Sequence, residues 1–209
     1  MQTKNCYCCF VYIAYTKSIY VFINMSIVAI IILSCVMIIT FIVLLWYFLD
    51  MFISLIRSRG VPYVPSFDKD LELMSDTLWL QPDKTLLDLW CGDGKALRYL
   101  VKKYDLTSWV GYEISVHAYL RWIYINWKKS IQNITIVHQS MYKADPKKYD
   151  YIYCYLMPFI MPSMEKWLEK NCSPGTVIIS NTFPLPNRKP DRIIKNKKGK
   201  DKIFLYTTY

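Results

Sequence analysis

The stretch Leu86–Lys95 constrains the fold more than any other part of the chain. An apolar run reaches Asp88, a tight loop with Gly92 and Gly94 follows, and an amphipathic segment extends over Lys95–Tyr104. This order predicts a strand, a loop and a helix. Glycine can adopt a positive φ and lets the main chain approach a ligand closely. We therefore interpret the loop as a nucleotide-binding turn, with an ordinary turn as the alternative.

Glu113 favours the nucleotide-binding interpretation. It ends a second apolar run, Trp109–Tyr112, at about the spacing at which a strand-borne acid accepts hydrogen bonds from ribose hydroxyls. Asp88 lies near the carboxyl end of the first strand, where open α/β sheets bind ligands. The alternative for Glu113 is a solvated acid at the end of a strand.

The rest of the chain alternates between helical and extended patterns. Further helices are predicted at 68–80, 116–130 and 164–171, and Ser66 or Asp68 could cap the first of them. Further strands are predicted at 134–138, 149–156 and 176–180, and two more, at 192–194 and 203–206, flank a turn at Gly199. We therefore predict an α/β domain with a doubly wound, mostly parallel, seven-stranded Rossmann-like sheet that ends in an antiparallel hairpin.

A long apolar run near the N-terminus predicts a transmembrane helix. Residues 18–49 contain no charge, and 27–48 are mostly Ile, Leu, Val, Met and Phe. About 20 apolar residues suffice to cross a bilayer, whereas the apolar region of a signal peptide has about 7 to 15. The run ends in Trp46-Tyr47-Phe48, which is typical of an interfacial aromatic belt. A signal peptide and a buried core helix are the alternatives. We predict that residues 1–56 form an N-terminal segment with the transmembrane anchor, and that residues 57–209 form a separate domain.

Positive charges beside the span predict its orientation. Arg57 and Arg59 follow the helix closely, and positive residues near the ends of a span tend to stay in the cytoplasm. We therefore expect a single-pass membrane protein whose large domain faces the cytoplasm. Lys4 and Lys17 precede the helix and weaken this prediction unless translation starts at Met25.

The cysteines and histidines indicate neither a disulfide framework nor a metal site. The seven cysteines show no spacing typical of a secreted protein, and Cys6, Cys8 and Cys9 cluster without a nearby histidine. We interpret His117 and His138 as surface or core residues. No metal site is therefore predicted.

Five short motifs carry a resemblance to a known family. They are 61–66, 88–94, 111–113, 155–158 and the segment that runs from Pro174-Gly175 through 180–186. With these motifs the chain resembles class I S-adenosylmethionine-dependent methyltransferases. Among them it is similar to the membrane-anchored protein-lysine methyltransferases of the ATP synthase c subunit and the adenine nucleotide translocase, with their prokaryotic relatives. The resemblance covers most of 61–186 and the placement of the anchor.

The resemblance implies S-adenosyl-L-methionine as cofactor and a lysine of a membrane-associated protein as substrate. The implied cofactor-binding residues are Asp88, Cys91, Gly92, Asp93, Gly94, Glu113, Ser140 and Tyr63. Asp88 and the glycines would hold the methionine end, and Glu113 the ribose. Tyr63 and its flanking prolines would help close the site, although composition alone favours a linker there.

Two further assignments concern the adenine and the lysine. Ser140 stands where relatives commonly place an Asp near the adenine, and it would be a weaker partner. Tyr153 and Tyr155 are the catalytic candidates because they could line the lysine pocket, with core packing of the fourth strand as the alternative. The sequence names no general base.

The net charge of +10 leaves other functions open. A basic cluster near the C-terminus could contact RNA phosphates or anionic lipids, or form a solvated hairpin. It comprises Arg188, Lys189, Arg192, Lys195, Lys197, Lys198, Lys200 and Lys202. The alternatives are thus an RNA or small-molecule methyltransferase and a non-catalytic binding module with this fold. The expected anchor makes the lipid bilayer a partner and favours a protein substrate over nucleic acid.

Trp90 stands where such loops usually carry their first glycine, so its indole is expected to clash with the cofactor or to force the loop open. The chain has seven tryptophans but only six glycines. We hypothesise that some tryptophans, Trp90 first, are glycines in the native host because UGA encodes glycine there. The codon for position 90 tests this hypothesis. We expect UGA, and a UGG codon would contradict the hypothesis.

Overall fold

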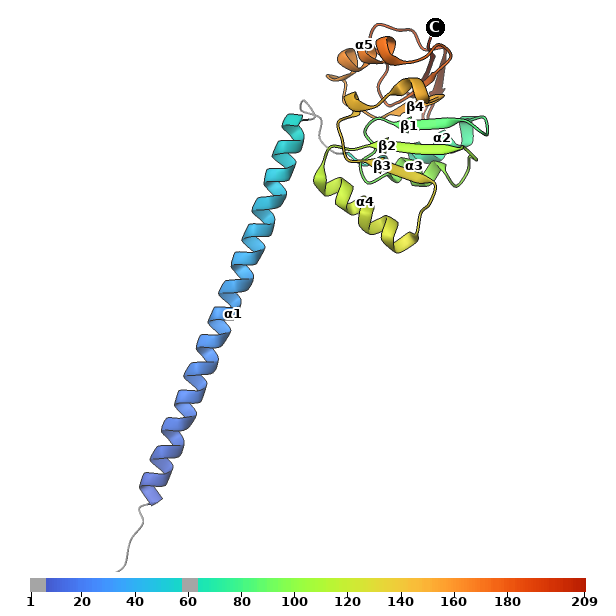
Figure 1. Cartoon of the computed structure of the whole chain (residues 1–209). Helices are drawn as coiled ribbons and strands as arrows, with labels where there is room; N and C mark the ends of the chain where they lie inside the picture. Colours follow the sequence, from blue (N-terminus) through green and yellow to red (C-terminus); the bar gives the residue numbers. More distant parts are fainter. Residues whose placement is uncertain (1–6, 58–63) are drawn as a thin grey trace, which may run out of the picture. The chain divides into compact units, whose positions relative to one another are not determined.

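The computed structural model describes residues 7–57 and 64–209 (Figure 1). The chain divides into two compact units, Met1–Leu49 and Asp50–Tyr209. The predicted domain boundary between residues 56 and 57 stays a prediction. Tyr63, one of the implied cofactor-binding residues, lies outside the described residues.

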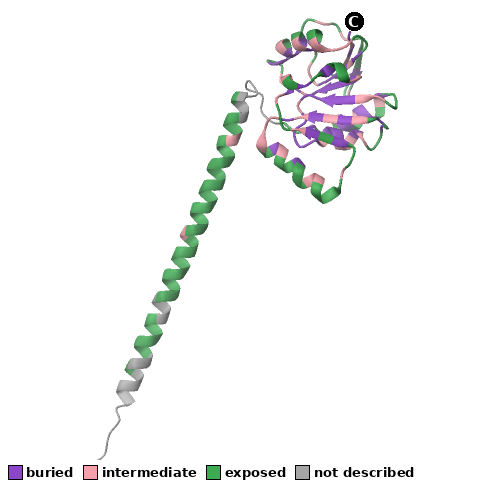
Figure 2. Ribbon diagram, viewed as in Figure 1, coloured by how far each residue is buried: buried purple, intermediate pink, exposed green. Residues whose placement is uncertain are grey.

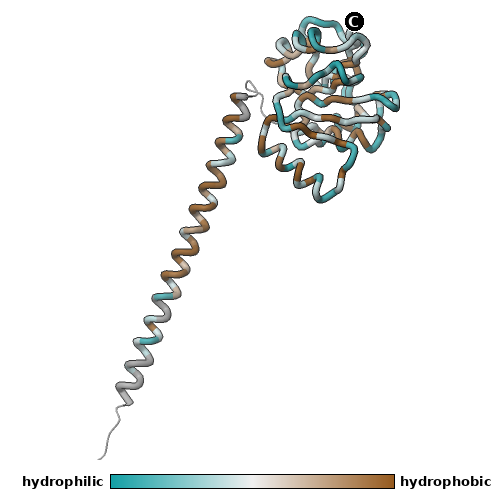
Figure 3. The backbone as a smooth tube through the Cα atoms, in the orientation of Figure 1, coloured by the Kyte–Doolittle hydropathy of each residue, from teal (hydrophilic) through white to brown (hydrophobic). Residues whose placement is uncertain are grey.

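The helix α1 (Tyr7–Arg57) contains the predicted apolar run. Its part Tyr15–Ile53 has 39 residues, and by length and composition it can cross a membrane. Apolar side chains along it, such as Ile31 and Leu33, are exposed (Figure 2, Figure 3). This helix is apolar all round and is not packed in a core, as expected for the predicted span. A signal sequence has the same properties, so that alternative stays open.

Seven strands form one sheet in the order β3-β2-β1-β4-β5-β7-β6. The parallel strands are β1 (Thr85–Asp88), β2 (Ser108–Tyr112), β3 (Ile134–Val137), β4 (Tyr151–Cys154) and β5 (Val177–Asn181). The antiparallel hairpin consists of β6 (Arg192–Lys195) and β7 (Asp201–Thr207), and β7 pairs with β5. The predicted seven-stranded sheet with its C-terminal hairpin is confirmed.

Helices cover both faces of this sheet (Figure 1). One face carries α2 (Asp68–Thr77), α3 (Lys95–Leu100) and α4 (Val116–Lys129), and the other carries α5 (Met161–Asn171). Two short 3-10 helices, Met141–Lys143 and Pro146–Lys148, follow β3.

Leu86 and Leu87 show how the sequence builds two cores. Neighbouring residues on a strand point to opposite faces, and both of these side chains are fully buried. Leu86 belongs to the core beneath α2, α3 and α4, whereas Leu87 belongs to the core beneath α5. An unbroken apolar run on β1 therefore reflects a strand buried on both sides, as in doubly wound sheets.

α3 and α5 differ from their predicted bounds. α5 begins at Met161 rather than at residue 164, because a proline such as Pro162 is tolerated in the first turn of a helix. α3 ends at Leu100 instead of Tyr104. The ring of Tyr104 is buried, and its hydroxyl donates to the carbonyl of Leu78 at 2.7 Å. This contact holds the ring of Tyr104 against the residue that follows α2.

α2 begins at Asp68 as predicted, but it ends at Thr77 rather than at residue 80, and its cap differs from the prediction. Phe67 is its N-cap and forms no side-chain capping hydrogen bond, so the predicted caps Ser66 and Asp68 are wrong. Asp68 lies in the first turn and pairs with Nζ of Lys95 at 2.9 Å. The Ser66 hydroxyl lies 3.4 Å from the hydroxyl of Tyr153. Both side chains thus connect the start of α2 to the sheet domain rather than capping the helix.

Gly111 on β2 allows the loop after β1 to lie against the sheet. A Cβ atom there would lie 2.5 Å from Sγ and 2.6 Å from Cβ of Cys91. We expect Gly111→Ala to lower the free energy of unfolding by about 1–3 kcal/mol through overpacking. Urea unfolding of the full chain, followed by circular dichroism, measures the change.

The control for this prediction is a compensating exchange. The double variant Cys91→Gly, Gly111→Ala removes both close contacts, so it should be more stable than the sum of the two single effects. Strictly additive effects of Cys91→Gly and Gly111→Ala would contradict the packing argument.

Candidate active site

Three strand ends bring predicted site residues to one edge of the sheet. Asp88 ends β1, Glu113 follows β2, and Tyr153 lies near the end of β4. β1 lies between the other two strands, and Asp88 is paired with Gly111 on one side and with Tyr153 on the other. The carboxyl ends of parallel strands share an edge, and ligands of open α/β sheets bind there.

The loop after β1 has the conformation that its glycines predict. Gly92 and Gly94 have φ values of 57° and 72°, which residues with side chains rarely adopt. The N–H of Gly94 donates to the carbonyl of Cys91 at 2.8 Å and closes the turn before α3. A Cβ atom on Gly94 would lie 2.7 Å from Cδ1 of Ile136 on β3. The positive φ therefore favours glycine at position 94, and a larger residue would also have to displace the end of the Ile136 side chain.

Asp88 places a carboxyl group where almost no water reaches it. The residue is 1% exposed, and Oδ1 accepts a hydrogen bond from the N–H of Trp90 at 3.2 Å. Burial raises the pKa of Asp88 to about 8, an effect that this hydrogen bond opposes only in part. A positive charge beside the carboxyl group would favour its ionised form. The position therefore suits a ligand that carries a cationic group.

Glu113 connects β2 to the loop after β1. Oε2 accepts a hydrogen bond from the N–H of Gly92 at 2.8 Å, and Oε1 accepts one from the N–H of Ser115 at 2.7 Å. Burial raises the pKa of Glu113 to about 7, while these main-chain donors lower it. Because the residue is only 1% exposed, it is not the solvated acid of the alternative interpretation.

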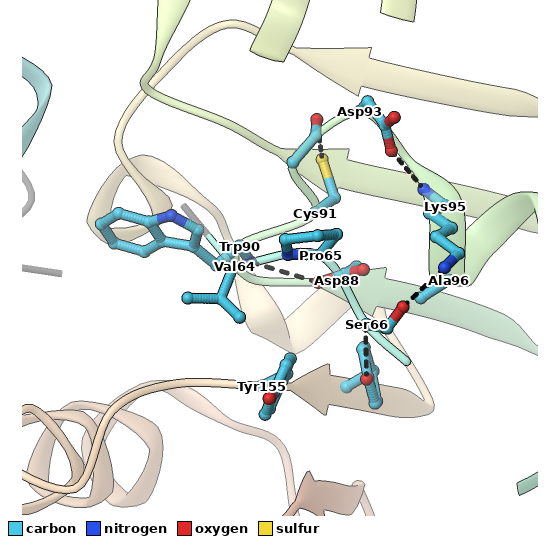
Figure 4. A pocket seen from close by; sticks show the side chains of 12 residues that line it. Val64, Pro65, Ser66, Asp88, Trp90, Cys91, Asp93, Lys95, Ala96 and Tyr155 are labelled. Atoms are coloured by element: carbon cyan, nitrogen blue, oxygen red, sulfur yellow. Dashed lines mark hydrogen bonds between the residues drawn. The ribbon is translucent and has the colours of Figure 1, made fainter. Parts of the chain in front are cut away.

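A narrow cavity lies beside Asp88 (Figure 4), and Glu113 is not among the residues that line it. Its lining includes Asp88, the loop 90–93, Tyr155 and the segment 64–66. Its volume is about 10 Å³, about the space that one water molecule needs. Nζ of Lys95 donates to the carbonyl of Ser66 at 2.8 Å and so fastens the segment 64–66 to α3. This segment, which composition alone assigns to a linker, therefore lies against the site.

Tyr153 and Tyr155 both line the cavity. Tyr153 is buried, and its hydroxyl accepts a hydrogen bond from Nδ2 of Asn181 at 3.1 Å and lies close to Ser66. Burial raises the pKa of both tyrosines, so they keep their protons at neutral pH. The sequence assigns no role to Asn181. The residue lies in the motif at 180–186, which is the signal that could have indicated its contact with Tyr153.

The carboxylate of Asp93 is engaged by the helices that follow the loop. Oδ1 accepts a hydrogen bond from the N–H of Lys95 at 3.1 Å at the start of α3. The same carboxylate pairs with Arg98 at 3.3 Å and with Arg121 of α4 at 3.1 Å. These contacts hold α3 and α4 at the loop, and the predicted contact of Asp93 with the cofactor stays a prediction.

Of the predicted residues Cys91 and Ser140, only Cys91 lines the cavity. Cys91 is buried against Gly111, and burial raises the pKa of its thiol. Ser140 follows β3, is not among the lining residues, and accepts a hydrogen bond on its carbonyl from Lys143. Ser140 thus follows the carboxyl end of β3 but lies outside the cavity, and its contact with the adenine stays a prediction.

Trp90 does not open the loop. Its φ is not positive, because the described non-glycine residues with positive φ are Asp83, Ser130 and Thr182. The indole is half-buried, packs against the core beneath α5 and extends away from Asp93 (Figure 4). The expectation that the indole forces the loop open is therefore wrong. Its clash with a bound cofactor stays a prediction.

The described part of the chain contains no cluster of metal-binding side chains. Within residues 7–57 and 64–209, no group of three His, Cys, Asp or Glu residues could hold a metal ion. The described cysteines 35, 91, 154 and 172 are free thiols.

Comparison with known families decides the assignment. The model of the ANTKMT methyltransferase domain matches residues 88–192, slightly more than half of the chain. The chain belongs to this family. The matched range begins at Asp88 and includes the glycine loop, Glu113 and Asn181. The predicted enzyme class, an S-adenosylmethionine-dependent methyltransferase, is confirmed at the level of the family.

Individual relatives are similar over the same part of this methyltransferase. The protein-lysine N-methyltransferase of Saccharolobus islandicus is 27% identical over 70% of this chain and 92% of its own length. The lysine N-methyltransferase of the ATP synthase c subunit from Homo sapiens is also 27% identical, over 72% of this chain, and the chain spans 63% of that protein.

A solved structure supports the fold. The crystal structure of an RNA methyltransferase from Salinibacter ruber in complex with S-adenosyl-L-homocysteine has a TM-score of 0.62. It is 21% identical and covers 69% of this chain and 93% of its own. At this identity the likeness concerns the fold alone.

The buried carboxyl groups predict an unusual pH dependence of stability. Asp88 has a pKa of about 8 in the folded protein, compared with about 3.9 in an unfolded chain. Between these values the folded protein binds more protons than the unfolded chain, so stability falls as pH rises. We expect the melting temperature without ligand to fall between about pH 5 and 8, and to fall less steeply in Asp88→Asn.

Glu169→Gln, which changes an exposed carboxylate on α5, is the control and should follow the unaltered chain. Equal pH slopes for Asp88→Asn and the unaltered chain would show that Asp88 is ionised in the folded protein.

Proposed function

We propose that this protein transfers a methyl group from S-adenosyl-L-methionine to a lysine side chain of a membrane-associated protein. The observation that carries the proposal is the pair of buried carboxyl groups, Asp88 and Glu113, on either side of a loop whose glycines have positive φ. The names of the relatives from Saccharolobus islandicus and Homo sapiens support lysine as the target.

The residues at the sheet edge fit this cofactor. Asp88 would accept hydrogen bonds from the cationic methionine end, and the positive charge would keep its carboxyl group ionised. Glu113 would accept hydrogen bonds from the ribose hydroxyls. Gly92 and Gly94 would let the main chain approach the ligand. When bound, the cofactor supplies a methyl group on a sulfonium.

Cofactor entry requires the segment 64–66 to move. Pockets for ligands of this size have about 300 to 1,000 Å³, whereas the cavity beside Asp88 has about 10 Å³. Displacing the segment breaks the hydrogen bond from Lys95 to the Ser66 carbonyl and separates the Ser66 hydroxyl from Tyr153. Tyr63 lies between the two prolines that are predicted to stiffen this part of the chain. We therefore propose that Tyr63 helps to close the cofactor site.

The chain's contribution to the chemistry is alignment and removal of water. The lysine must present a neutral amine, and an apolar pocket lowers its pKa. The substrate ammonium would first release a proton to water, and the neutral amine nitrogen would then bond to the methyl carbon as the bond from that carbon to sulfur breaks. Tyr153 and Tyr155, which line the cavity and stay protonated, would orient the amine.

We also propose that α1 anchors the protein in a membrane as a single span, with the catalytic domain at 57–209 in the cytoplasm. The length and composition of Tyr15–Ile53 support the span. Arg57 and Arg59 beside it support the orientation. The anchor would hold the domain near substrates that are themselves in the membrane.

Methyl transfer to lysine tests this proposal. The full chain in detergent is incubated with methyl-labelled S-adenosylmethionine and solubilised membrane proteins, and the products are hydrolysed to amino acids. We expect the label in methyl-lysine. Glu113→Gln should bind the cofactor about 10- to 100-fold more weakly at subsaturating concentration, because it loses charge-assisted hydrogen bonds worth about 1.5–3 kcal/mol.

Glu169→Gln on the exposed side of α5 should retain full transfer. Label in RNA or in small molecules, without methyl-lysine, would replace the proposed substrate class. Unchanged transfer by Glu113→Gln at limiting cofactor would contradict the role of this carboxylate.

A further inference from the structure

An apolar stripe runs along the exposed side of α4. Leu120 and Ile123 are 47% and 45% exposed, and Tyr124 and Trp127 are 57% and 79% exposed. Their spacing of three and four residues places all four on one side of the helix. We name these four side chains the apolar stripe. Ring centroids of Tyr124 and Trp127 lie 6.4 Å apart, so the aromatic part is contiguous.

The stripe is separate from the side of α4 that packs on the sheet. Ala118 and Trp122 are buried, and Trp122 lies beside Gly94 of the cofactor loop. α4 is thus apolar on two sides, although one side is enough to attach a helix to a sheet. Single exposed apolar residues are common, whereas four on one side of a helix form a candidate interaction surface.

The charges on α4 favour an anionic partner. The helix contains Arg121, Lys128 and Lys129 and no acidic residue. Lys128 and Lys129 are exposed at its end, whereas Arg121 pairs with Asp93. A helix with Trp, Tyr and Leu on one side and flanking lysines has the composition of an interfacial membrane helix, whose lysines attract anionic headgroups.

The chain's own length keeps α4 within reach of a membrane. About ten residues separate the end of α1 at Arg57 from the start of α2 at Asp68, and they can span at most about 35 Å. If α1 crosses a bilayer, the sheet domain is tethered at that bilayer's surface. A tether of this length makes the contact between α4 and the bilayer intramolecular. Even a short apolar stripe with weak affinity is then enough to bind the bilayer surface.

We propose that the apolar stripe of α4 docks on the headgroup layer of an anionic bilayer. This inference rests on the proposed anchor and adds a second membrane contact. α4 begins at Val116, directly after Glu113 and its hydrogen-bond donor Ser115. Docking of α4 therefore fixes the sheet edge that carries the site relative to the membrane surface. Lysines close to the headgroups become the accessible substrates.

Photocrosslinking of the full chain in nanodiscs tests the docking. Separate variants carry p-benzoyl-phenylalanine at position 127 in the stripe, at position 79 or at position 44 in α1. Trp79 is a matched control because it is 76% exposed and lies outside α4. Position 44 reports the span itself. Mass spectrometry identifies the partner of each adduct, in phosphatidylcholine with and without phosphatidylglycerol.

We expect lipid adducts at positions 44 and 127, and several-fold fewer at 79. Phosphatidylglycerol should raise the yield at 127 several-fold, and Lys128→Gln with Lys129→Gln should reverse this gain, since each lysine near an anionic surface contributes about fivefold in partitioning. Adducts at 44 with none at 127 overturn the docking and leave the anchor standing. Absence of adducts at 44 overturns the anchor.

Protein adducts at 127 also overturn the lipid assignment. Crosslinks to residues of α1, or to a second copy of the chain, would identify the stripe as a protein interface. Equal lipid yields at 127 and 79 would show that the exposed aromatic ring at 127 has no preferred contact with the bilayer.

Discussion

The hydrogen bond from the N–H of Gly92 to the Glu113 carboxylate, 2.8 Å long, is the contact on which the site depends. It holds the loop after β1 against the end of β2, and the second oxygen of Glu113 binds Ser115 at the start of α4. A buried carboxylate is costly unless hydrogen bonds satisfy it. Glu113 thereby sets the positions of the glycine loop and of α4, and with them the wall of the cavity.

The same contacts explain why this edge of the sheet can hold a charged ligand. Asp88 and Glu113 have raised pKa values because they are buried. A ligand with a positive charge near Asp88 and hydroxyls near Glu113 would satisfy both groups. The segment 64–66 covers this space, and the bond from Lys95 to Ser66 keeps it there. Cofactor binding and movement of the segment are therefore coupled.

The sequence predicts what depends on local patterns and misses what depends on distant side chains. The apolar runs, the glycines and the acids at strand ends predict the parallel sheet and the approach of Asp88 to Glu113. The contact of Asn181 with Tyr153 joins residues on different strands, and no local pattern indicates it. Periodicity also predicts α4, but it cannot tell which tryptophan faces inward. Burial distinguishes Trp122, which packs beside Gly94, from Trp127, which is exposed.

The central claim is that the edge formed by Asp88, the glycine loop and Glu113 binds S-adenosylmethionine. Calorimetric titration of the full chain and of Trp90→Gly tests this claim most directly. Trp90 lines the cavity and its indole is predicted to clash with the cofactor, so we expect one binding site per chain and tighter binding by Trp90→Gly than by the unaltered chain (Figure 4). If both proteins are folded and neither binds the cofactor, the methyltransferase site is not functional, and a binding module with this fold becomes the better description.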